Sequence, residues 1–340
     1  MQRGIRHFAT ATLLPLPALA AGAVIDARWG LGALAALTLG VAGLDAVMPR
    51  DRAQGAGTAA DGALLTILAL MPLPLLALAA CAAGLPVAGG APARAGALAA
   101  IGVWLGTTGS AAALALLHAR APGARAVGRF ALRLLALGPL AVTDPAVHHR
   151  FAATSRDPTT ARRGESLYAY LPRAWGGAFR LARHGARTRR RAAGHGGGRA
   201  TGPVLADLAL VACPPALGVA LGGPAAGAAI CGVVGLALLL TLTRAYVQHY
   251  GLRREPRPDG RMAPLAAWHA WNAPHWASGL MLLNATRHSD LHAHPGAPFT
   301  TLRDSAPVLP RGPYVMIALA FLPPVWHRVM ARRLPSEETG

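Results

Sequence analysis

Residues 224–252 read PAAGAAICGVVGLALLLTLTRAYVQHYGL, a long apolar run that ends in the polar group GlnHisTyrGlyLeu. The part from 224 to 246 is long enough to cross a bilayer as a helix, because about 20 apolar residues suffice. His249 follows about one helical turn later, where an imidazole meets a metal without being buried in lipid. This stretch therefore predicts a membrane helix that carries a histidine to the membrane surface.

The rest of the chain has the same apolar character. Of its 340 residues, 53% are hydrophobic and only 14% are charged, and the mean hydropathy is +0.37. A soluble protein of this length would carry about a quarter charged residues. The other apolar runs that predict membrane helices are 8–26, 30–48, 61–83, 96–118 and 204–222. We therefore expect an all-α, polytopic membrane protein with six transmembrane helices, built as one membrane-embedded domain over 1–340.

The distribution of arginine predicts the orientation of these helices. Most arginines lie in 49–60, in 119–203 and after 246, whereas the opposite loops hold little beyond Arg28 and Arg94. Basic residues favour the cytoplasmic side of a membrane. We therefore expect a multi-pass protein of a bacterial inner membrane, with both termini and the segments 119–203 and 247–340 in the cytoplasm. Residues 192–203, rich in glycine, predict a flexible linker.

The net charge of +19 has a membrane explanation. The arginines flank apolar spans, where each pairs with anionic headgroups at roughly 1 kcal/mol, so we do not expect a nucleic-acid partner. A basic cytoplasmic face also favours an acidic soluble partner. The three cysteines lack CxxC spacing, which makes a disulfide framework or a zinc–thiolate site unexpected.

Histidines gather on the predicted cytoplasmic face, beside the ends of the spans. His288 and His292 are four residues apart, so on a helix they share a face and can chelate one ion. His148 and His149 are adjacent and diverge by about 100° on a helix, so they can reach two metals, or one metal from two directions. His118 closes the fourth span. Each group alone is weak evidence, but together with His249 they predict a cytoplasmic, histidine-rich metal site.

The motifs around these histidines resemble those of the integral-membrane alkane hydroxylases (alkane 1-monooxygenases), within the membrane fatty-acid desaturase and hydroxylase superfamily. With the expected spans, the resemblance covers nearly the whole chain. The motifs that carry it are GlnHisTyrGlyLeu at 248–252, HisAlaTrpAsnAlaProHis at 269–275, ArgHisSerAspLeuHisAla at 287–293, LeuArgAsp at 302–304, HisHisArg at 148–150 and AspProThrThrAlaArgArgGlyGluSerLeuTyr at 157–168.

The resemblance implies a site for two non-haem irons held mainly by histidines. It implies insertion of one atom of O₂ into a terminal C–H bond of an alkane or fatty-acyl chain that enters from the bilayer, with electrons from rubredoxin, an acidic protein. Imidazole suits ferrous iron and leaves positions open for O₂. The ligands that the resemblance implies are His118, His148, His149, His249, His288 and His292.

The chain departs from the family pattern at several ligand positions. Leu114, Asp144 and Leu291 stand where the family has histidines, and Gln248 stands where it has glutamate. Asp144 can bind iron through oxygen, whereas leucine cannot. Nearby groups that can compensate as ligands are His269 and His294. Groups expected to support the ligands are Asp157, Glu165, Asp290 and His275, although turn and cap roles explain the acidic ones equally well.

Two functional hypotheses follow, and a third is weaker. The first is a working non-haem iron monooxygenase with a rearranged metal site. The second is a degenerate relative that binds one metal or none and acts as a lipid-binding or regulatory membrane protein. Transport is less well supported, because transporters place ionisable groups near the bilayer midplane, and the ones noted here, Asp45 and Asp207, lie close to span ends.

Overall fold

The computed structural model describes residues 4–51, 57–192, 201–255, 257–258 and 261–334. Within these ranges the chain is all-α, as the sequence predicts, with no strand and two isolated β-bridges, Asp26–Ala88 and Asn272–Val308. Most of the predicted glycine-rich linker lies outside the described residues.

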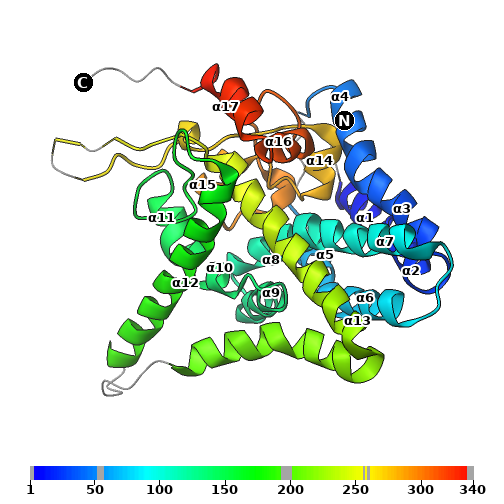
Figure 1. Ribbon diagram of the computed structural model, residues 1–340. Helices are drawn as coiled ribbons and strands as arrows, with labels where there is room; N and C mark the ends of the chain where they lie inside the picture. The colour runs from blue at the N-terminus through cyan, green and yellow to red at the C-terminus, as the bar shows by residue number, and fades with distance from the viewer. Residues whose placement is uncertain (1–3, 52–56, 193–200, 256, 259–260, 335–340) are drawn as a thin grey trace.

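The first four apolar runs form helices long enough to span a membrane, each built from two or three pieces (Figure 1). Prolines stand at two of the joints, Pro15 and Pro72, where the missing N–H interrupts the helical ladder. Two other spans contain a π-helical turn. The pieces are α1 (Ile5–Leu13) and α2 (Leu16–Val24); α3 (Ala27–Ala35), η1 (Ala36–Gly40) and α4 (Val41–Val47); α5 (Ala59–Leu70) and α6 (Pro72–Gly84); and α7 (Gly90–Trp104), η2 (Leu105–Gly109) and α8 (Ser110–Leu117).

The expected fifth and sixth spans form one bent element, α13 (Thr201–His249). Its bend lies at Gly223, where φ is 76°, and Pro224 begins the second arm. Glycine adopts this left-handed conformation without the penalty that a Cβ would bring. The described residues therefore contain five candidate membrane helices, and six separate spans are not confirmed. The side of the membrane on which each loop lies stays a prediction.

The second arm of α13 packs closely against the central helix of the bundle. The helix Gly90–Leu117 is almost wholly buried. A Cβ added to Gly106 in η2 would lie 2.8 Å from Cα of Ala237, so glycine is required for this approach. Small residues at such contacts let membrane helices pack backbone to backbone. This contact fixes the end of α13, and so His249, relative to α8 and His118.

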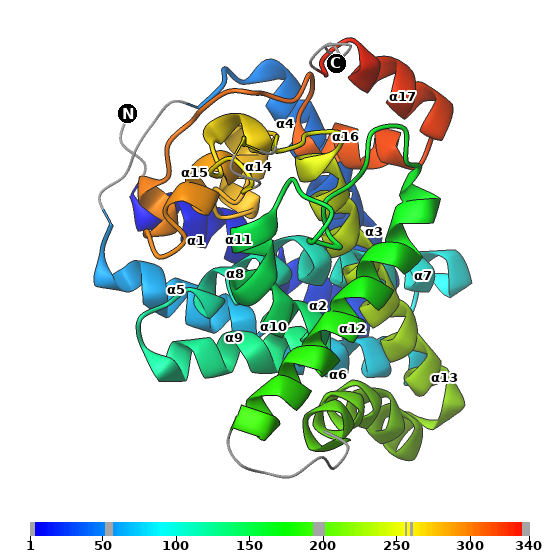
Figure 2. The same ribbon diagram turned by 90° about the vertical axis from the view of Figure 1, so that its left-hand side faces the viewer.

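The segments after the spans gather over the end of α13 (Figures 1 and 2). Asp45 of α4 accepts hydrogen bonds through Oδ1 from the backbone N–H groups of Ala277 and Ser278 and so caps α14. Arg287, fully buried, pairs with Asp51 at 2.8 Å just before α15. These bonds tie the C-terminal segment to the spans. Its elements and those of the middle segment are α9 (Pro122–Leu134), α10 (Gly138–Thr143), η3 (Asp144–His148), α11 (His149–Phe151), α12 (Leu167–Ala192), η4 (Ala267–His269), α14 (Trp276–Met281), α15 (His288–Ala293), η5 (Phe299–Thr301), α16 (Pro313–Ala320) and α17 (Pro323–Ala331).

Candidate metal centre

Four histidines from three separate elements converge, and we call them the four-histidine group. His148 comes from η3, His249 from the end of α13, and His288 and His292 from α15. The Nε2 atoms of His249 and His288 are 2.9 Å apart, and Nε2 of His292 lies 3.4 Å from the first and 3.2 Å from the second. Nitrogen ligands meeting at one point are the donor set of a transition-metal site.

The chemistry of these rings fits a cation at their centre. Burial, reinforced by the neighbouring imidazoles, lowers the pKa of His288 and His292 well below 6.5, so both rings are neutral. The Nδ1 atoms of His249, His288 and His292 are buried without a hydrogen-bond partner among the described residues. A hydrogen shared between two of these rings can satisfy at most two of the three converging Nε2 atoms. A metal ion would accept all three lone pairs.

A second set of ligands lies beside the first, and we call it the His–Asp group. Nε2 of His118, at the end of α8, lies 2.9 Å from Oδ2 of Asp144, the first residue of η3. Nε2 of His149 lies 3.7 Å from the same oxygen. Two histidines and one carboxylate form a ligand set that non-haem iron uses elsewhere. The carboxylate that replaces an expected histidine thus lies among the other expected ligands.

The charges of the His–Asp group differ from those of the four-histidine group. Burial opposes ionisation of Asp144, but the hydrogen bond from His118 and the nearby histidines outweigh it, and its pKa falls to about 2. Burial lowers the pKa of His149 to about 4, so this ring is neutral near pH 7. The His–Asp group therefore contains an anion and the four-histidine group does not.

Adjacent residues divide between the two groups. His148 belongs to the four-histidine group and His149 to the His–Asp group, and their ring planes are at 90°. The π-helical turn η3 runs from Asp144 to His148, so one short element supplies a ligand to each group. Turns of this type are rare and occur often at functional sites.

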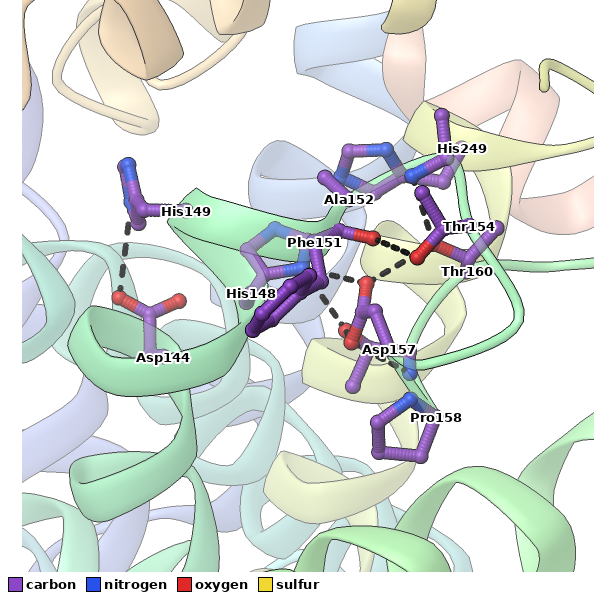
Figure 3. A network of polar contacts seen from close by, with 12 residues as sticks. Asp144, His148, His149, Phe151, Ala152, Thr154, Asp157, Pro158, Thr160 and His249 are labelled. Atoms are coloured by element: carbon purple, nitrogen blue, oxygen red, sulfur yellow. Dashed lines mark hydrogen bonds and ion pairs between the residues drawn. The ribbon is translucent and has the colours of Figure 1, made fainter. Parts of the chain in front are cut away.

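Asp157 orients His148 (Figure 3). Its Oδ2 lies 2.9 Å from Nδ1 of His148, and it also accepts hydrogen bonds from Thr159 and Thr160. The pKa of Asp157 lies below its ordinary value, because the positive charge and hydrogen bond of His148 outweigh the effect of burial. An anion at Nδ1 holds the hydrogen there and leaves Nε2 free for the centre of the group.

The structure does not bring the remaining expected residues into either group. Glu165 accepts from Arg173 at 2.6 Å, and Asp290 lies 3.1 Å from His294, whose side chain is 65% exposed. Nδ1 of His269 accepts from the N–H of Ala266. His275 is buried, and burial lowers its pKa.

One cavity of about 240 Å³ joins the two groups. Leu114 and Leu291, where the family has histidines, line it as apolar walls. Arg244 and Asp61 also line it, two residues for which the motifs in the sequence predict no role. Arg244 can be recognised from the sequence as a candidate functional residue, because it is a charged residue inside the apolar run 224–246. The cavity is therefore lined both by candidate metal ligands and by apolar side chains.

Comparison with known proteins agrees with this geometry. Residues 97–316 match the family model described as fatty acid desaturase, a range that contains both groups of ligands. The chain belongs to the fatty acid desaturase family. An alkane 1-monooxygenase of Pseudomonas aeruginosa is 30% identical over 95% of this chain and 85% of its own length, which assigns this desaturase-family chain to the alkane hydroxylase group.

Other relatives match over a shorter range. An alkane 1-monooxygenase of Alcanivorax borkumensis is 32% identical over 62% of this chain and 52% of its own length, so the chain spans about half of that relative. A xylene/toluene monooxygenase hydroxylase component of Pseudomonas putida is 29% identical over 54% of this chain and 49% of its own length.

Proposed function

We propose that this desaturase-family protein holds two irons and hydroxylates a terminal C–H bond of an alkane or similar apolar chain with O₂. The observation that carries the proposal is the pair of ligand groups on one apolar cavity, with Asp144 supplying a carboxylate where the family has an imidazole. The names of the relatives, which include alkanes, xylene and toluene, support an apolar substrate.

Each residue has a definite task in this proposal. Nε2 of His148, His249, His288 and His292 would hold one iron, and His118, Asp144 and His149 the other. Bound iron would supply the activation of O₂ and the cleavage of the C–H bond, which are cofactor chemistry. The ligand set leaves Leu114 and Leu291 free to hold the substrate chain and exclude water.

We infer an electron donor of acidic, rubredoxin type. Arginines are numerous in 119–203 and in the segment after 246, the two segments that carry all the ligands except His118. A positive surface steers an acidic protein toward it and orients the encounter. On the predicted topology this surface and the metal centre are cytoplasmic.

Metal analysis of the purified full chain tests the proposal. We expect about two irons per chain and a spectroscopic signature of a coupled pair. One iron per chain, or a tenth of the expected content, would favour the alternative of a lipid-binding or regulatory relative. Turnover of octane to 1-octanol, or of dodecanoate to its terminal hydroxy acid, with reduced rubredoxin tests the reaction itself, and no product from either chain in a two-iron preparation would reject it.

A further inference from the structure

Arg244 is a buried cation inside the membrane helix α13. Only 7% of the residue is exposed. Its Nη1 donates to the backbone oxygen of Thr107 at 3.3 Å, its one side-chain hydrogen bond to a described residue. Among the described residues no carboxylate lies within 4.0 Å of its guanidinium. A buried charge without a counter-ion is costly, and inside a membrane such a residue marks a functional site.

Arg244 lines the cavity that joins the two ligand groups, and it also lines a smaller cavity of about 10 Å³ beside it. Thr241 and Gln248 lie three and four residues away on the same face of α13 and line the cavity too. Thr241 donates its single O–H to Ala237, and the Gln248 amide donates one N–H to Ala285, so neither of these neutral groups supplies a charge. A guanidinium has five N–H donors, and all but one of these remain available. Arg244 is thus the cationic donor that the cavity offers to a ligand.

We propose that Arg244 binds the carboxylate of a fatty-acid substrate, so that the chain accepted by this cavity carries one anionic end. This inference rests on the proposed function, since it takes the cavity to be the substrate site. The planar guanidinium matches a carboxylate in a two-point hydrogen bond, and a neutral alkane leaves it unpaired. A cavity of about 240 Å³ with one arginine suits a single chain with one charge rather than a two-chain phospholipid.

The acidic groups of the cavity do not compete for Arg244. Asp144 is bonded to His118 in the His–Asp group. Both carboxylate oxygens of Asp61 accept hydrogen bonds from threonine hydroxyls, those of Thr58 and Thr300. The lining also includes apolar residues, among them Leu114, Leu291 and Phe299, that would contact the hydrocarbon part of the substrate. The anion that completes Arg244 must therefore come with the ligand.

Equilibrium binding to the purified full chain in phosphatidylcholine nanodiscs tests this proposal. The probes are dodecanoate, 1-dodecanol and dodecyl phosphate, measured without turnover on metal-free and iron-loaded protein. We expect dodecanoate to bind at least about tenfold more tightly than 1-dodecanol, as a charge-assisted hydrogen bond implies. In Arg244→Gln this ratio falls to about one, and Arg244→Lys keeps part of it. Arg94→Gln, which alters an arginine outside the cavity, leaves the ratio unchanged.

Several results would overturn the assignment. Equal binding of dodecanoate and 1-dodecanol to the unmodified chain is one, and an unchanged ratio in Arg244→Gln is another. Tighter binding of dodecyl phosphate than of dodecanoate would identify a phosphate ligand instead. An altered iron spectrum in Arg244→Gln with an unchanged binding ratio would assign the arginine to the metal centre. Because the ratio is measured without iron, it holds or fails independently of the oxygenase reaction.

Discussion

The four-histidine group and the His–Asp group lie side by side, yet they handle charge in different ways. The His–Asp group contains its own anion, and His118 and Asp144 form a hydrogen-bonded pair without any metal. The four-histidine group has converging nitrogens, neutral rings at His288 and His292 and no carboxylate of its own, and its nearest anion, Asp157, acts through Nδ1 of His148. The comparison indicates that a carboxylate can stand among the ligands in place of an imidazole, and that the four-histidine group, which has no anion of its own, depends more heavily on metal.

Removal of one ligand from each group tests the assignment most strongly. We expect His288→Ala and His149→Ala each to abolish hydroxylation, by roughly 100-fold or more, and to lose about one iron per chain. Iron content and product formation are measured on the same preparations.

His294→Ala is the matched control for these variants, because it removes an exposed imidazole of the same segment outside both groups. It should keep both irons and full turnover. Full turnover in His288→Ala or His149→Ala would show that the ligand assignment is incorrect.

The orienting role of Asp157 predicts a smaller effect confined to one group. Asp157→Asn removes the anion at Nδ1 of His148, so the four-histidine group should lose affinity for iron by about 10- to 100-fold. The His–Asp group should keep its iron. Chelator titration followed by iron spectroscopy measures the two losses separately. Equal weakening of both sites would mean that Asp157 supports the fold as a whole.

Metal removal should affect the two groups unequally. A ligand present at 100 times its Kd stabilises the folded state by about 2.7 kcal/mol. Chelation should remove the stabilisation that metal gives to the four-histidine group, and this loss should be seen around α15. Hydrogen exchange before and after chelation measures this. We expect protection to fall more over 288–293 than over 144–149, where His118 and Asp144 stay paired. The opposite order would contradict the comparison.

Whether a feature of the fold or the site can be predicted from the sequence depends on how far apart along the chain the interacting residues lie. The apolar runs and the histidine spacing predict the helices and the ligands His288, His292, His148 and His149, because these depend on neighbours along the chain. The grouping of ligands depends on tertiary contacts. Asp157 and Glu165 lie in the same segment and are predicted to have the same supporting role, yet only Asp157 contacts a histidine of the four-histidine group. The bend at Gly223, which joins two expected spans in one element, likewise depends on a single backbone angle.

Glu165→Gln provides the smallest and most selective test, since this carboxylate lies outside both groups. Glu165 accepts from Arg173, and although burial opposes it, this bond lowers the pKa of Glu165 below 4.5. A depressed carboxyl pKa stabilises the folded state above pH 4.5, and this contribution disappears as the pH falls through the lower, folded pKa. The substitution should therefore lower the free energy of unfolding by about 1 kcal/mol near pH 7 and by less below pH 4. It should leave the iron content equal to that of the unmodified chain at each pH. Thermal unfolding at several pH values and iron content measure both, and loss of iron in this variant would extend the support of the metal centre to Glu165.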